Sequence, residues 1–166
     1  LPRRIRSDNG APFASTGLGG LSPLAVWWIR LGIQPVRITP GCPGQNGAHE
    51  QFHRVLKAET TRPPAATFAA QHRRFAAFVT TYNTDRPHNA LADHVPPAAL
   101  YTPSPRAFPR QLPPIEYPST ADVRRARGSG EIRWRARWLF LTGTLRGHDV
   151  SFEPVADGEW LVRFAD

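Results

Sequence analysis

Apolar residues recur at helical spacing in three segments of the chain, residues 22–32, 48–60 and 67–82. The first segment opens on Ser22-Pro23, a pair that suits the N-cap and the first position of a helix. It closes on Gly32, the residue type that most often follows a helix end. The pattern therefore predicts three helices in the first half of the chain.

Two short segments on either side of the first helix have the composition of strands. Residues 3–6 place Ile5 among arginines just before an Asn-Gly turn, and residues 33–39 alternate between apolar and polar positions. The order strand, helix, strand, helix, helix predicts an α/β layer fold, with Trp27 and Trp28 in or near its core. Because so basic a strand is unusual as a first element, we expect the chain to begin within a fold.

The second half of the chain has a different composition. Residues 83–118 are rich in proline, which predicts a semi-rigid strap, with a single helical turn over residues 97–101. Residues 119–166 alternate apolar and polar positions around glycine turns at 128–130 and 157–158. That pattern predicts a small all-β unit, most simply a five-stranded barrel.

The charge balance points to an anionic partner. The chain has 166 residues, 21 basic and 13 acidic side chains, a formal charge of +8 and an isoelectric point near 11.1. Every basic residue except Lys57 is an arginine, whose planar fork matches phosphate. Nucleic acid is the first expectation, ahead of an anionic membrane or an acidic protein.

Several classes of protein are disfavoured by what the sequence contains. No apolar run approaches the roughly 18 residues of a membrane-spanning helix. A single cysteine, Cys42, excludes a disulfide framework and any zinc module built on cysteine pairs. Five of the histidines fit no Cys/His module and are expected on the solvated surface: His49, His53, His72, His88 and His94. We expect a protein of the reducing cytoplasm, associated with the nucleoid.

Two carboxylates occupy positions suited to metal-dependent chemistry. Asp8 follows the first predicted strand, and Glu50 lies in the first turn of the second predicted helix. Carboxylates at a strand end and at a helix start can converge on Mg²⁺, which prefers oxygen ligands. Arg54 and Lys57 follow Glu50 at helical spacing, which would place a carboxylate and two phosphate-binding cations on one face. Considered singly, Asp8 suits ordinary turn chemistry and Glu50 ordinary helix-start chemistry.

Three motifs in order resemble one family. Residues 7–10 are similar to the strand-turn motif of the second catalytic Asp in transposases of the retroviral-integrase superfamily. Residues 42–50, which end in Asn-Gly-Ala-His-Glu, resemble the loop and helix start that carry the catalytic Glu of these enzymes. Residues 82–91 match the Tyr-Asn-x-x-Arg-Pro-His-x-x-Leu segment of the bacterial insertion-sequence members. The similarity extends from residue 1 to about residue 101.

The resemblance implies a fold, a chemistry and a partner. It implies a partial RNase H-like integrase core over residues 1–82, the proline-rich strap over 83–118, and an SH3-like, DNA-binding barrel over 119–166. It implies cleavage and strand transfer of DNA with Mg²⁺ or Mn²⁺, and a homo-oligomer that binds transposon ends and target. Asp8 and Glu50 would then be the catalytic metal ligands, and Asn46, Arg54 and Lys57 would contact the transposon end.

One departure from the family affects activity. The family uses three carboxylates, the first on an upstream strand, and no acidic residue precedes Asp8 here. The resemblance also implies that the first three strands of the sheet are missing, so the strand at residues 3–6 would have an exposed edge. We therefore expect this chain by itself to be inactive in strand transfer. The alternative is a non-catalytic DNA-binding or oligomerising remnant or regulator of a complete transposase, and a third possibility is an SH3-like module that binds peptides.

Arginines are concentrated at the start of the predicted β unit. Arg133 and Arg135 flank Trp134, which predicts one cationic strand face, and Arg124 and Arg125 lie just upstream. Arginine interleaved with aromatic residues favours contact with the DNA backbone, and a solvated strand face is the simpler alternative. Asn83, Arg86, Pro87 and His88 are expected to fix the strap against the core and to take no part in chemistry.

Overall fold

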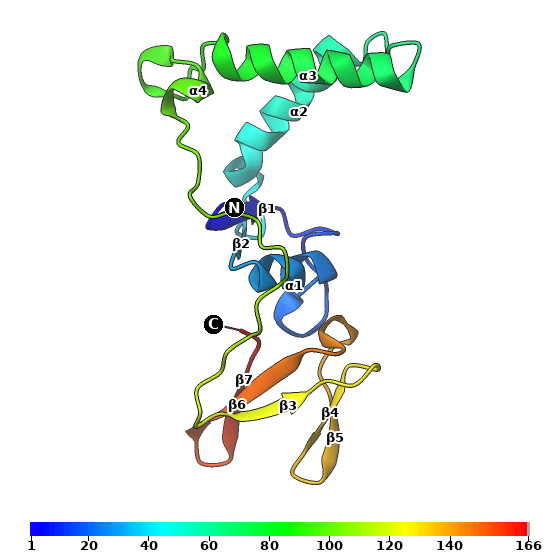
Figure 1. The fold of residues 1–166 in the computed structure, drawn as a ribbon, viewed down its shortest axis with the longest axis vertical. Helices are drawn as coiled ribbons and strands as arrows, with labels where there is room; N and C mark the ends of the chain where they lie inside the picture. Colours follow the sequence, from blue (N-terminus) through cyan, green and yellow to red (C-terminus); the bar gives the residue numbers. More distant parts are fainter. Residues whose placement is uncertain (166) are drawn as a thin grey trace. The chain divides into compact units, whose positions relative to one another are not determined.

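The computed structural model describes residues 1–165 and divides the chain into two compact units. The first unit combines Leu1–Cys42 with the chain from Arg106 onwards, and the second is Pro43–Pro105. Figure 1 shows the helices and strands of the chain. The assignment of residues 1–82, 83–118 and 119–166 to three family domains stays a prediction.

The N-terminal part of the first unit is a strand-helix-strand motif. Strand β1 (Arg4–Ser7) pairs in parallel with β2 (Gln34–Arg37), and helix α1 (Pro23–Arg30) connects them after a short 3₁₀ turn, η1 (Leu18–Gly20). The Ser22 hydroxyl accepts the Ala25 N–H at 3.1 Å, which confirms the predicted N-cap. In the described part of the chain, β1 has β2 as its only strand neighbour, so its other edge is open as predicted.

The C-terminal part of the first unit contains the five strands predicted by the sequence. Strands β3, β6 and β7 form one antiparallel sheet, and β4 and β5 form another. A 3₁₀ turn, η4 (Gly143–Leu145), precedes β6. This pairing does not close into a barrel. The strands span Asp122–Arg125 (β3), Glu131–Trp134 (β4), Arg137–Phe140 (β5), Asp149–Ala156 (β6) and Glu159–Arg163 (β7).

Both glycine turns form, but only one of them joins two strands that pair with each other. Gly158, with φ of +76°, connects the paired strands β6 and β7 as predicted. Gly130, with φ of +86°, lies in the turn between β3 and β4, which pair in separate sheets. The sequence identifies the turn, whereas the choice of strand partner depends on contacts with more distant residues.

The core of the first unit joins its two parts. Val26 of α1 is buried in the same cluster as Ile132, Trp134, Val150 and Phe152 of the C-terminal strands. The opposite side of α1 packs Trp28 with Leu31 and Ile33. Helix α1 therefore supplies apolar side chains to two clusters.

The two adjacent tryptophans of α1 have different surroundings. Trp28 is 7% exposed and stacks on Phe13, which confirms its place in the core. Trp27 is 43% exposed, and its ring lies near Phe108, 6.2 Å away between centroids. Adjacent residues point about 100° apart on a helix, so both rings cannot face one core. The prediction of a core environment is therefore wrong for Trp27.

The second unit is helical. It contains η2 (Pro43–Asn46), α2 (Gly47–Thr60), α3 (Phe68–Thr84), η3 (Ala92–His94) and the single turn α4 (Pro97–Leu100). Phe52 of α2 contacts Phe78 and Tyr82 of α3, at 6.0 and 5.1 Å between ring centroids. The predicted helices agree with α2 and α3 to within two residues, and none of the helices described in residues 1–165 is long and apolar enough to span a membrane.

Candidate catalytic and DNA-binding residues

Asp8 lies directly after the carboxyl end of β1 and is exposed. Its Oδ1 accepts the Gly10 N–H at 2.9 Å, which closes a turn over Asn9. The Asn9 amide donates to the Ile38 carbonyl oxygen at 2.9 Å and so ties this turn to the chain that leaves β2. Two contacts thus hold the backbone that carries the Asp8 carboxylate: the local turn and the hydrogen bond from Asn9 to Ile38, which follows β2.

Glu50 lies in the first turn of α2 and is also exposed. Together with Gly47, Gln51 and Arg54 it lines a shallow hollow on the helix surface, and Arg54 donates to the Gln51 side-chain oxygen. Lys57, one turn further along α2, is exposed as well. Because all three residues lie on one regular helix, the spacing of four and seven positions places Glu50, Arg54 and Lys57 on one face, as predicted.

Asn46, the remaining predicted DNA contact of this region, immediately precedes α2 and is half-buried. Its side chain makes no capping bond to the helix. A donor and an acceptor thus lie beside the N-terminus of α2, where the helix dipole favours negative charge.

The two predicted metal ligands belong to different compact units, Asp8 to the first and Glu50 to the second. Their exposed carboxylates are of the type that Mg²⁺ or Mn²⁺ binds. Among residues 1–165, no group of three or more His, Cys, Asp or Glu side chains is placed to hold a metal ion. A complete three-carboxylate site is therefore not assembled by the described residues.

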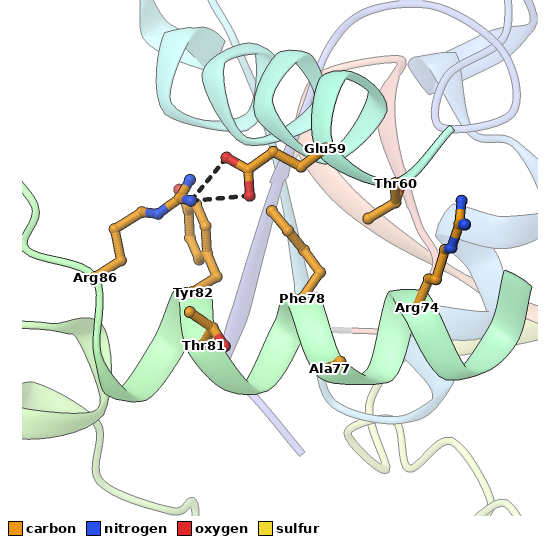
Figure 2. A pocket seen from close by; sticks show the side chains of 8 residues that line it. All are labelled: Glu59, Thr60, Arg74, Ala77, Phe78, Thr81, Tyr82 and Arg86. Atoms are coloured by element: carbon orange, nitrogen blue, oxygen red, sulfur yellow. Dashed lines mark hydrogen bonds and ion pairs between the residues drawn. The ribbon is translucent and has the colours of Figure 1, made fainter. Parts of the chain in front are cut away.

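Helix α2 is anchored at its far end by Arg86. The guanidinium donates to both carboxylate oxygens of Glu59 at 2.7 and 2.9 Å, and it lies 5.8 and 5.7 Å from the ring centroids of Phe78 and Tyr82 (Figure 2). The His88 ring meets Tyr82 edge-on, 4.6 Å between centroids. Arg86 and His88 thus hold the segment after α3 against the helices, which confirms the structural role predicted for them.

The C-terminal arginines do not form the single cationic strand face that the sequence predicted. Arg133 is exposed on β4 between the buried residues Ile132 and Trp134. Arg135 is not on a strand, because Arg135 and Ala136 have φ of +45° and +67° and form the tight turn into β5. Arg-Ala lacks the Asn or Gly typical of such turns, so the sequence carried no signal for it.

Arginine side chains of this unit stack on tryptophan rings. Arg135 lies 4.7 Å from the Trp160 ring centroid, and Arg127 lies 4.0 Å from that of Trp138. Arg124 and Arg125 are consecutive on β3, so their side chains point to opposite faces. Both are exposed, and each pairs with an aspartate, Arg124 with Asp122 and Arg125 with Asp149.

A histidine lies among charged groups where α1 meets the C-terminal strands. Arg30 donates to His148 Nδ1 at 3.4 Å and to the Pro113 carbonyl oxygen at 3.0 Å. Burial and the positive charges of Arg30 and Arg125 lower the pKa of His148 below its ordinary 6.5, and Asp149 opposes this in part. His148 is therefore neutral at pH 7 and serves as an acceptor for Arg30.

The expectation of surface histidines overlooked a local arrangement on α2. His49 and His53 are both exposed, but their Nε2 atoms lie only 3.0 Å apart. Their spacing of four residues within a predicted helix was a usable signal. A comparison with Cys/His zinc modules does not detect such a pair, because those modules combine ligands from separate segments.

Known proteins resemble this chain across its central region. Residues 31–96 match the integrase core domain family, a range that includes Glu50 and the motif at 82–91 but not Asp8. The insertion element IS476 uncharacterized 39.2 kDa protein of Xanthomonas euvesicatoria is 34% identical over 98 residues, which is 58% of this chain. The chain spans 26% of that relative's length. The resemblance seen in the motifs is thus confirmed: the chain is similar to an insertion-element protein, and its residues 31–96 are similar to the integrase core domain.

Proposed function

We propose that the chain acts in metal-dependent DNA strand transfer, as part of a transposase. The observation that carries the proposal is Glu50, which lies within the integrase core match, in the first turn of α2, with Arg54 and Lys57 on the same face. The position of Asp8 after the parallel strand β1 supports it. This arrangement provides a carboxylate for a metal ion and cations for DNA phosphates.

Asp8 and Glu50 would hold Mg²⁺ or Mn²⁺, which supplies Lewis-acid stabilisation of charge at the reacting phosphate. Arg54 and Lys57 would bind phosphates of the transposon end, and Asn46 would contact the same strand near the helix start. In the first step a water oxygen displaces the 3′-oxygen at the element end, which leaves as a hydroxyl. In the second step that hydroxyl attacks a target phosphodiester and displaces the target's own 3′-oxygen.

The finer architecture belongs to this proposal. The parallel β1–α1–β2 motif supports part of an RNase H-like core, and the five C-terminal strands with their exposed arginines support an SH3-like, DNA-binding unit. We also propose that the chain acts as a homo-oligomer bound to transposon ends in the nucleoid. Since the family resemblance calls for three carboxylates and residues 1–166 offer two at matching motifs, we expect no strand transfer from this chain alone.

The test is transposition by a complete transposase that contains this chain, scored as marker hops between plasmids. Glu50→Gln keeps the size of the side chain but removes its charge, so transposition should fall to background. Glu116→Gln, which changes an exposed carboxylate in the strap, is the matched control and should leave the frequency unchanged. Normal transposition with Glu50→Gln would remove Glu50 from the mechanism.

The Arg-rich C-terminal strands favour a second function, non-catalytic DNA binding. Such binding would need no metal, would weaken steeply with salt because it releases counterions, and would survive Asp8→Asn. Loss of Arg133 should reduce the slope of log K against log salt by about one. A plasmid nick by this chain that requires Mg²⁺ or Mn²⁺ would favour strand-transfer chemistry over this alternative.

A further inference from the structure

Two histidine rings face each other on the exposed surface of α2. His49 and His53 lie one helical turn apart, with 4.4 Å between ring centroids and an interplanar angle of 84°. Their Nε2 atoms approach to 3.0 Å, which is within hydrogen-bond distance. Two ring nitrogens are thus brought close together by their spacing of four residues on one regular helix.

The distance between the nitrogens suits a metal chelate. Zinc–imidazole bonds are about 2.0–2.1 Å long, so two ligands at a tetrahedral angle have nitrogens about 3.3 Å apart. Ligands at the right angle of square-planar or octahedral sites have nitrogens about 2.9 Å apart at the same bond length. The observed 3.0 Å lies between these values, so the two nitrogens are already separated by a distance that suits chelation of one metal ion.

We propose that His49 and His53 together chelate one divalent transition-metal ion of the zinc, nickel or copper class. Imidazole nitrogen suits these borderline ions, whereas Mg²⁺ requires oxygen ligands. The chelate therefore differs in chemistry from the magnesium ligation proposed for Asp8 and Glu50, and it holds whether or not those carboxylates bind magnesium. The two imidazoles supply two coordination positions, and water fills the rest.

The surroundings of the pair limit it to a binding role. His49-Glu50-x-x-His53 has the spacing of the helical zinc motif of metallopeptidases. Catalytic zinc in those enzymes takes three protein ligands, and no group of three metal-binding side chains occurs in residues 1–165. Arg54 and Lys57 on the same helix add positive charge and lower the affinity for a cation. We therefore infer an exchangeable metal site and no peptidase centre.

The experiment is a calorimetric Zn²⁺ titration of the whole chain, repeated with His49→Ala, His53→Ala and the double variant. Because a chelate needs both rings, each single variant should lose the 1:1 Zn²⁺ binding as completely as the double variant does. Any Zn²⁺ binding that remains should have a Kd at least ~10-fold weaker. His72→Ala, an exposed histidine on α3, is the matched control and should bind as the unmodified chain does. Unchanged binding by either single variant, or losses that add in the double variant, would overturn the chelate.

A second measurement needs no substitution. Substoichiometric Cu²⁺ should broaden the ring-proton resonances of His49 and His53 before those of the other four histidines, because copper is paramagnetic. Excess Mg²⁺ should leave this selective broadening intact. Broadening spread evenly over all six histidines, or its removal by Mg²⁺, would refute the proposed site.

Discussion

Replacing Arg86 by glutamine removes the ion pair that anchors the end of α2. The Arg86 and Glu59 side chains are 33% and 44% exposed, so their paired hydrogen bonds contribute about 0.5–1 kcal/mol. The contacts of Arg86 with the Phe78 and Tyr82 rings are at the outer limit of cation–π range and add about 0.5 kcal/mol each. We therefore expect the Arg86→Gln variant to lose about 1.5–2 kcal/mol of unfolding free energy.

Two spectroscopic probes separate the two compact units. All 5 tryptophans lie in the first unit, whereas the second unit holds the two longest helices described. Thermal unfolding followed by circular dichroism at 222 nm therefore reports mainly on the second unit, and tryptophan fluorescence reports on the first. Arg86→Gln should lower the dichroism midpoint by about 6–16 °C and leave the fluorescence midpoint in place.

A conservative variant, Arg86→Lys, tests which contacts of Arg86 contribute to stability. Both hydrogen bonds to Glu59 come from one guanidinium nitrogen, Nη2, so Arg86→Lys can keep the ion pair. It loses the planar group that lies beside the Phe78 and Tyr82 rings, so it should recover no more than about half of the lost stability. An unchanged dichroism midpoint for Arg86→Gln would show that the ion pair contributes nothing to the second unit. An equal shift of both midpoints would show that the two units unfold together.

The remaining predictions concern the first unit and use tryptophan fluorescence. Gly130→Ala forces a Cβ to within 2.3 Å of the Thr142 carbonyl oxygen at a φ of +86°, so it should destabilise this unit by about 2–4 kcal/mol, whereas Gly128→Ala meets open space and should not. His148 is the only histidine in this unit, and its pKa is lowered on folding. Since the unfolded chain then binds the proton more readily, stability should be complete above pH 6.5 and fall as the pH drops below it. His148→Gln should flatten that dependence, and an equally steep pH profile in this variant would contradict the assignment.

Features that depend on neighbours within about one helical turn were predictable from the sequence. Ser22 caps α1 and Thr67 caps α3, because a hydroxyl needs only the N–H three residues ahead. The positive φ of Gly158 follows from the missing Cβ in a tight turn. The position of Glu50 in the first turn of α2 was predictable for the same reason, since helix spacing and the motif around it are local.

The contacts between residues distant in the sequence were not predictable from local patterns. Val26 shares a core with Ile132, more than a hundred positions away, and strand β3 pairs with β6 and not with its neighbour β4. The turn at Arg135 contradicts its local propensity, because burial of Trp134 against the stacked ring of Phe152 fixes where β4 ends. Such choices depend on the total apolar surface that the folded chain buries, and no local pattern of residues encodes that sum.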